Sequence, residues 1–162
     1  MNTLRKIVES KIRIQYQDCD PFNHLNNSKY IDCIVAARTE QLLDNYNFNT
    51  ADILQKQGVG WVAAQTQISY IYPAIWLENV IVETRLIAFS EFSLLVEGIM
   101  WNDSKSQIKA IMWGKLVHFN IKTQRSHKHS PEFMNLFDQI HYPIENNKDF
   151  NDRVKILKQL NQ

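Results

Sequence analysis

The chain has 162 residues, with 18 Lys and Arg against 17 Asp and Glu, and a formal net charge of +1 at pH 7. Hydrophobic residues make up 44% and charged residues 22%, which is ordinary globular usage and excludes a fibrous or intrinsically disordered chain. The length fits one compact domain with its own core. The charge balance gives no reason to expect nucleic acid or an anionic membrane as a partner.

Signs of export and membrane insertion are also missing. The first eleven residues alternate charged and apolar positions, unlike a signal peptide, and no run approaches the roughly 20 apolar residues of a membrane span. The two cysteines, Cys19 and Cys33, cannot form a framework of disulfides. We therefore expect a cytoplasmic protein without a membrane span.

In chain order, the alternation of apolar and polar residues in Arg13–Gln17 predicts a short, half-buried strand. Turn-forming residues fill Asp18–His24, and the proline among them disfavours a helix, so this segment is predicted to be an ordered loop. One of residues 26–28 then caps a helix that runs to about Tyr46.

This helix is apolar on nearly every side between Tyr30 and Ala37, so we expect it to be buried on several sides. The small side chains of Ala36 and Ala37 would allow the backbone of another element to approach closely. A short second helix, residues 51–57, is predicted to be capped by Thr50 and to end at Gly58.

The following half of the chain is rich in β-branched and aromatic residues, which predicts four long strands: Val59–Tyr72, Val80–Phe89, Phe92–Trp101 and Gln107–Ile121. The short breaks at Ser90-Glu91 and Asn102-Asp103-Ser104 are typical of hairpins between antiparallel neighbours. An α+β fold follows, in which one antiparallel sheet of five strands wraps around the apolar helix.

The C-terminal part is predicted to be helical. Pro131 opens a short helix, and Asp149–Leu160 places four apolar residues at helical spacing. We treat residues 131–162 as a helical extension of the domain formed by residues 1–130. Its last helix has the pattern of a surface or partner-packing helix.

The segment Tyr16–Arg38 carries the groups suited to chemistry: two carboxylates, a histidine and two asparagines between a strand and the start of a buried helix. The N-terminus of a helix offers unpaired N–H groups and a partial positive charge, which can polarise a carbonyl and stabilise an oxyanion. A nearby carboxylate could attack that carbonyl or activate water. Together these groups would form a minimal site for acyl transfer to water.

The same segment resembles a known family. Asp18-Cys19-Asp20-Pro21, His24-Leu25-Asn26-Asn27, Tyr30 and Ala37-Arg38 resemble the signature of the 4-hydroxybenzoyl-CoA thioesterase-like group of hotdog-fold acyl-CoA thioesterases. The similarity extends from about Lys11 to Gln124, with Tyr72-Pro73-Ala74 resembling the family's Pro-Ala step. Beyond about Phe133 we find no clear family counterpart.

The resemblance implies a hotdog thioesterase domain that hydrolyses acyl-CoA without a cofactor, as a homodimer joined sheet edge to sheet edge or as a homotetramer. It places Asp20 in the catalytic position, as nucleophile or general base, and the N–H of Asn27 at the thioester carbonyl. His24, Asn26 and Tyr30 would bind the substrate in the same pocket, which the family builds at the dimer interface.

Two positions depart from the family pattern. Asn23 replaces a common glycine, which is tolerable because asparagine visits left-handed conformations. Leu77-Glu78 replaces a glycine-aspartate pair and leaves open a different turn at that place.

Structural interpretations stand beside these functional ones. Asp18 fits a turn residue, His24 could simply hold the loop by hydrogen bonds, Asn26 and Asn27 could only cap the helix, and Tyr30 could be plain core. Catalysis by either cysteine is disfavoured because no histidine is placed to activate it. The histidines lack the spacing of a metal site, so no metal is predicted.

Three further questions stay open at this stage. A basic stretch after the last strand, Lys122 to His129, is typical of a solvated loop, but in this fold a basic edge could meet the phosphates of coenzyme A. The alternative substrate is an acyl carrier protein. The alternative function is a non-catalytic acyl-binding or scaffolding module, suggested by the C-terminal helix.

Overall fold

A computed structural model describes residues 3–145 and 148–161. Its strands are β1 (Ile7–Arg13), β2 (Val59–Tyr70), β3 (Asn79–Phe89), β4 (Ser93–Asn102), β5 (Ile108–Asn120) and β6 (Arg125–Ser126). Its helices are α1 (Asn27–Tyr46), α2 (Thr50–Gln57), α3 (Pro131–Ile140) and α4 (Phe150–Leu160), with a 3-10 turn at Tyr16–Asp18. None of the helices among these residues combines the length and apolar character needed to cross a membrane.

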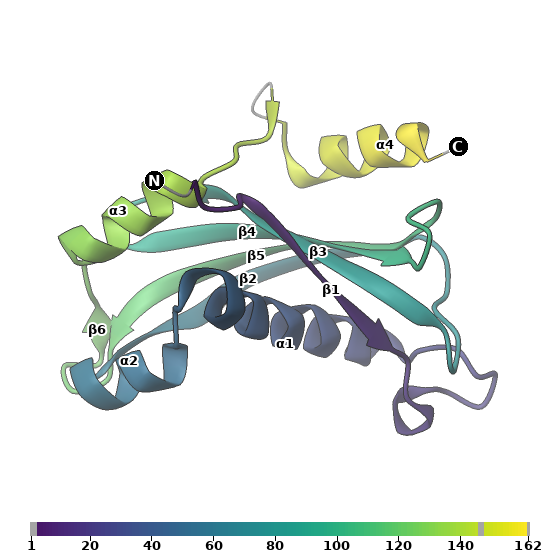
Figure 1. Ribbon diagram of the computed structural model, residues 1–162, viewed down its shortest axis with the longest axis horizontal. Helices are drawn as coiled ribbons and strands as arrows, with labels where there is room; N and C mark the ends of the chain where they lie inside the picture. Colours follow the sequence, from purple (N-terminus) through teal and green to yellow (C-terminus); the bar gives the residue numbers. More distant parts are fainter. Residues whose placement is uncertain (1–2, 146–147, 162) are drawn as a thin grey trace.

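One antiparallel sheet organises the fold. The strand order is β1-β3-β4-β5-β2, and the short β6 pairs with the end of β5. The four long strands lie within two residues of the predicted bounds, and both predicted hairpins, β3–β4 and β4–β5, are present. The sheet curls around α1, which lies across its concave face (Figure 1). This arrangement confirms the predicted α+β class and the hotdog fold.

The burial of α1 differs from the prediction. Its buried residues, Tyr30, Ile34, Ala37 and Gln41, follow one another at helical spacing and form a single stripe toward the sheet. Val35, on the other side of the helix, is 51% exposed. The expectation of burial on several sides is therefore wrong for the single chain, because the sheet covers only one face of the helix.

A glycine of the sheet allows α1 to approach closely. A Cβ placed on Gly98 in β4 would come well within 3.0 Å of the Cγ2 methyl of Ile34. Of the two alanines expected to allow close approach, Ala37 is buried and Ala36 is exposed. Gly98 thus sets how deeply α1 sits in the sheet.

The first strand is also misplaced by the prediction. The strand β1 pairs with β3 from Ile7 to Arg13, and the chain leaves the sheet at Ile14. The side chain of Ile14 is nevertheless 2% exposed, so the apolar alternation continues beyond the ladder and gave a false signal. The true strand was not recognised because the charged residues Glu9 and Lys11 of this edge strand weaken its apolar pattern.

Two helix termini show how local chemistry sets the bounds. The cap of α2 is Asn49 and not Thr50 as predicted, because the side chain of Asn49 accepts a hydrogen bond from the N–H of Asp52 at 3.0 Å. Gly58 ends α2 in the left-handed conformation, with φ of 68°, as expected.

Leu77, in the turn before β3, also has a positive φ, 70°, so it takes a conformation that costs any residue with a Cβ.

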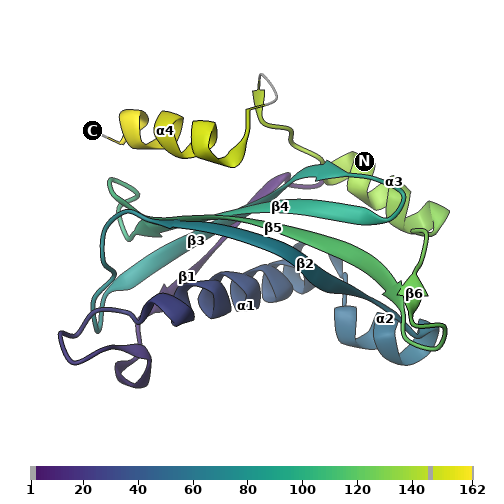
Figure 2. The same ribbon diagram turned by 180° about the vertical axis from the view of Figure 1, so that it is seen from behind.

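The C-terminal extension wraps around one edge of the sheet. On the concave side, Phe133 and Phe137 of α3 pack against Phe48. The chain then passes the last residues of β3, which lie beyond its pairing with β1. There His141 forms a parallel bridge to Leu86. It finally places α4 on the convex face, opposite α1 (Figures 1 and 2).

The contacts of α4 settle where this helix packs. Three of the four apolar residues predicted to share a face, Phe150, Val154 and Leu157, are buried against the convex side of the sheet. Arg153 forms a two-pronged ion pair with Glu97 of β4, with both N···O distances 2.9 Å. The helix therefore covers the chain's own sheet.

Candidate active site

The loop before α1 holds the carboxylate of Asp20 in place. One carboxylate oxygen, Oδ1, accepts hydrogen bonds from the backbone N–H groups of Phe22 at 2.8 Å and His24 at 3.1 Å. The N–H of Asp20 donates to the carbonyl of His24 at 2.8 Å. Asn23, between them, takes the left-handed conformation with φ of 63°. Among the described residues we find no donor to Oδ2, so that oxygen is left for other partners.

The start of α1 is fixed by its cap. The Oδ1 of Asn26 accepts hydrogen bonds from the N–H of Ser28 at 3.2 Å and from its hydroxyl at 3.1 Å, and the N–H of Asn26 donates to the carbonyl of Asp18 at 2.9 Å. We find no acceptor among the described residues for the N–H of Asn27. This donor lies in the first turn, where the helix also carries a partial positive charge.

The carboxylate and the helix start share one hollow, which we call the Asp20 pocket. Its volume is about 230 Å³. It is lined by Asp20, His24, Leu25, Asn27, Tyr30, Tyr70, Ile71, Tyr72 and Pro73. Of the five predicted site residues, four line this pocket; Asn26 does not, and its side-chain oxygen is used by the cap.

Tyr30 joins the helix to the opposite wall of the pocket. It is 2% exposed, and its hydroxyl accepts a hydrogen bond from the N–H of Ala74 at 3.0 Å. Burial raises the pKa of Tyr30, so the phenol is neutral and keeps its own proton to donate. The residue thus anchors the Pro-Ala step and still faces the pocket.

Sequence analysis missed two residues that shape this site. Tyr70 lines the pocket, packs edge-on against Tyr30 and donates from its hydroxyl to the carbonyl of Asn27 at 3.1 Å. Lys109 lies buried behind the wall, where its ammonium binds Glu78 at 2.7 Å and the carbonyl of Pro73 at 3.1 Å. The aromatic residue at the end of β2 was the available signal for Tyr70, and the sequence offered none for Lys109.

Within the described part of the chain, the cysteines and the potential metal ligands do not provide a second centre for acyl transfer. Burial, and then the carboxylates of Asp18 and Asp20, raise the pKa of Cys19, while burial is also the main cause that raises the pKa of Cys33. Both thiols are therefore poor nucleophiles. Across residues 3–145 and 148–161 no three potential ligands are grouped as a metal site would require.

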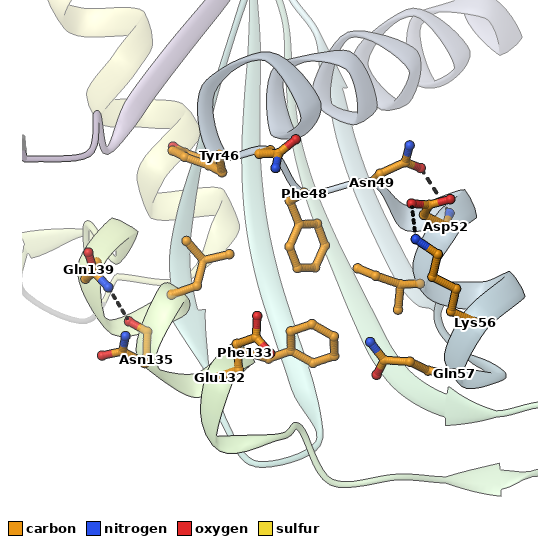
Figure 3. A pocket seen from close by; sticks show the side chains of 13 residues that line it. Tyr46, Phe48, Asn49, Asp52, Lys56, Gln57, Glu132, Phe133, Asn135 and Gln139 are labelled. Atoms are coloured by element: carbon orange, nitrogen blue, oxygen red, sulfur yellow. Dashed lines mark hydrogen bonds and ion pairs between the residues drawn. The ribbon is translucent and has the colours of Figure 1, made fainter.

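A larger hollow, about 410 Å³, lies at the other end of α1 between α2 and α3 (Figure 3). Phe48 and Phe133 form part of its lining, and Lys56 there is paired with Asp52 at 3.0 Å. Its two carboxylates, Asp52 and Glu132, belong to the first turns of α2 and α3 themselves, whereas Asp20 stands on a separate loop before α1. This hollow is larger than the Asp20 pocket, but the chemistry favours the Asp20 pocket.

Comparison with known proteins agrees with this assignment. The model of the family described as the thioesterase-like superfamily matches residues 14–137, which include the whole Asp20 pocket. Among curated proteins, none matches the sequence.

Several solved structures share the fold. A probable thioesterase from Escherichia coli, YbaW, is 19% identical with a TM-score of 0.70, over 83% of this chain and 98% of that one. A putative oleoyl thioesterase from Lactobacillus plantarum is 23% identical with a TM-score of 0.75, over 89% of this chain and 54% of that one.

A third structure bears on the C-terminal extension. A DHNA-CoA thioesterase from Staphylococcus aureus is 15% identical with a TM-score of 0.73, over 96% of this chain and 95% of that one. The structural likeness therefore reaches into the extension, for which the sequence had suggested no counterpart beyond about Phe133.

Proposed function

The chain belongs to the thioesterase-like superfamily, and from this premise we propose that it hydrolyses acyl-CoA thioesters to a carboxylic acid and free coenzyme A at the Asp20 pocket. The observation that carries this proposal is the pairing, in one hollow, of a fixed carboxylate with the first turn of α1. A thioester hydrolase needs these two groups and no cofactor.

The helix start would act on the carbonyl. An acyl group in the pocket can direct its oxygen toward the free N–H of Asn27, where a hydrogen bond and the helix dipole stabilise the negative charge that develops on that oxygen. Because the donor is a backbone N–H held by the cap at Asn26, it needs little reorganisation during the reaction.

Asp20 would supply the second half of the chemistry by one of two routes. As a general base, it takes a proton from water while the water oxygen attacks the carbonyl carbon; the carbon–sulfur bond then breaks and the thiolate recovers a proton. As a nucleophile, its oxygen forms an anhydride and expels the thiolate, and water then hydrolyses the anhydride. The unpartnered Oδ2 is the atom available for either route.

The remaining predicted residues would bind the substrate. The exposed imidazole of His24 lies at the pocket, while its backbone holds the loop, so both proposed roles of this residue are compatible. Tyr30 and Tyr70 offer apolar ring surface to an acyl group. Asn26 would contribute through the cap that it forms.

We place the second copy of the chain on β2. This strand is an edge of the sheet and has no Asp, Glu, Lys or Arg from Val59 to Tyr70, whereas the opposite edge strand, β1, carries three charged residues. Charges on an edge strand are a common protection against pairing with another chain. The uncharged edge is therefore the one suited to a homodimer, and two dimers could pair further into a tetramer.

The test is thiol release from a panel of short, long-chain and aromatic acyl-CoAs by the wild type, Asp20→Asn and Asp20→Ala. Asparagine keeps an oxygen that can accept from Phe22 and His24, so this variant should stay folded while turnover falls by about 10²–10⁴-fold. Asp18→Asn serves as the control, since Asp18 does not line the pocket. A folded wild type that releases no thiol from any acyl-CoA would favour a carrier-protein substrate or a binding module.

A further inference from the structure

A tight, basic turn connects β5 to β6, and nothing in the proposed chemistry uses it. We call residues 121–125 the basic turn. The Oδ1 of Asn120 accepts hydrogen bonds from the N–H groups of Lys122 at 2.9 Å and Thr123 at 3.2 Å, and Gln124 has a φ of 59°. Its backbone is therefore ordered by its own hydrogen bonds.

The charges on this turn are free to bind a ligand. Lys122 and Arg125 are exposed, and no carboxylate of the described residues pairs with either of them. The next cation along the chain, Lys128, differs, because it lies 3.4 Å from Glu91. Two unneutralised cations on a rigid turn suit a ligand with phosphate groups.

Within one chain the basic turn is far from the Asp20 pocket. It lies beside the first residues of β2, since the N–H of Ile121 donates to the carbonyl of Gly58 at 3.0 Å and Asn120 pairs with Val59. The pocket uses Tyr70 at the other end of the same strand. At about 3.4 Å per residue, the strand separates the two places by roughly 37 Å.

When a second copy of the chain pairs along β2, the basic turn of one copy comes close to the Asp20 pocket of the other. The unbroken run of exposed residues in β2 is 62–67, and a two-fold axis through its centre, between Ala64 and Gln65, pairs Tyr70 with the partner's Val59. Adjacent strands are about 4.8 Å apart, so the partner's Lys122, just beyond the end of β5, would lie on the order of 10 Å from Tyr70 across two strand spacings, and the partner's Arg125, on β6, about one spacing farther.

We propose that the basic turn of one protomer binds the phosphate groups of the acyl-CoA whose thioester lies in the Asp20 pocket of the other protomer. This inference rests on the proposed function. The pantetheine arm separates the sulfur of coenzyme A from its phosphates, so the two ends of one substrate need binding sites that are apart but on the same side of the dimer. Lys122, which lies nearest to β2, meets the phosphates first.

The first experiment compares one acyl group on two carriers, coenzyme A and pantetheine, because acyl-pantetheine has no phosphate. In Lys122→Glu/Arg125→Glu, the KM for acyl-CoA should rise about tenfold, since two exposed ion pairs are lost. Added salt should narrow this difference from the wild type, because it screens attraction in the wild type and repulsion in the variant. The KM for acyl-pantetheine and kcat for both substrates should stay the same. The control is Lys155→Glu/Lys158→Glu on α4, which makes the same change in net charge on the convex side of the sheet.

The second experiment asks whether the turn acts across the dimer. Mixed dimers are made by coexpressing an Asp20→Asn chain with a Lys122→Glu/Arg125→Glu chain under two different tags. If the turn serves the neighbouring site, one site of each mixed dimer is fully intact, and activity with the wild-type KM returns at half the wild-type level. If the turn serves its own chain, every active site has the raised KM.

The outcomes separate the inference from the proposed function. An unchanged KM for acyl-CoA, an equal rise for both carriers, an equal effect of the control variant, or mixed dimers with only the raised KM would each overturn the role of the basic turn and leave the hydrolase standing. A wild type inactive on both carriers would overturn the proposed function and this inference with it.

Discussion

Adding one methyl group at Gly98 tests the packing that positions the central helix α1. In Gly98→Ala the new Cβ meets the Cγ2 methyl of Ile34. Ile34 is 1% exposed, and as a β-branched residue inside a helix it has essentially one rotamer available. The side chain therefore has little freedom to swing away, so either α1 or β4 must move.

The expected loss of stability follows from the two opposing effects. Overpacking of a close-packed core costs about 1–3 kcal/mol, while alanine is favoured over glycine in a strand by roughly 0.5–1 kcal/mol. We expect Gly98→Ala to lose on the order of 1–2 kcal/mol. A shift of α1 also moves the N–H of Asn27 relative to Asp20, and a misplacement near 1 Å can lower turnover by about 10²-fold.

Urea unfolding with an unchanged m-value measures the stability, and thiol release measures turnover. The control is Gly114→Ala in the neighbouring strand β5, where a Cβ would meet only Met112 at 3.8 Å, so its stability should stay equal or rise slightly. Ile34→Ala, which removes the opposing methyl, should cost less in the Gly98→Ala background than alone, whereas Ile34→Val keeps that methyl and should give no relief. Equal midpoints for the wild type and Gly98→Ala would refute the reasoning.

Two further predictions concern groups away from the pocket. Burial is the main cause that lowers the pKa of His118 and His129. Because the unfolded chain then binds protons more readily than the folded protein, the stability that these neutral histidines contribute should be complete above about pH 6.5 and fall as the pH drops below it. In thermal unfolding, His118→Phe should lose less stability than the wild type over the same drop in pH. Burial opposes ionisation of Glu97, but hydrogen bonds and charge from Arg153, together with Trp113 and Arg85, outweigh it and lower the pKa of Glu97. Because Arg85 and Trp113 still hold the carboxylate, Arg153→Met should destabilise the protein by about 2 kcal/mol in urea unfolding. The same change should cost less in a Glu97→Gln background, and additive losses would contradict a direct pair.

The sequence determined the parts of this protein that depend on local patterns. The long strands, the two hairpins and the central helix follow from β-branched and aromatic content, turn residues and caps, each read within a few neighbouring positions. The carboxylate and the helix start could be placed together for the same reason, since Asp20 and Asn27 are only seven residues apart and share one loop. Asn23 was correctly expected to tolerate the left-handed conformation in that loop.

Tertiary structure decided what lies across the chain. Tyr70 reaches the site only because β2 passes the start of α1, 43 residues away from Asn27. Glu97 can be charged inside the protein because Arg85 of β3 pairs with it across the ladder and Arg153, 56 residues later, returns over the convex face to pair with it as well. The edge strand β1 and the one-sided burial of α1 were mispredicted for a related reason. Local propensity records which residues favour a strand or a helix, whereas burial, pairing and the completed pocket depend on which distant surfaces the curled sheet brings into contact.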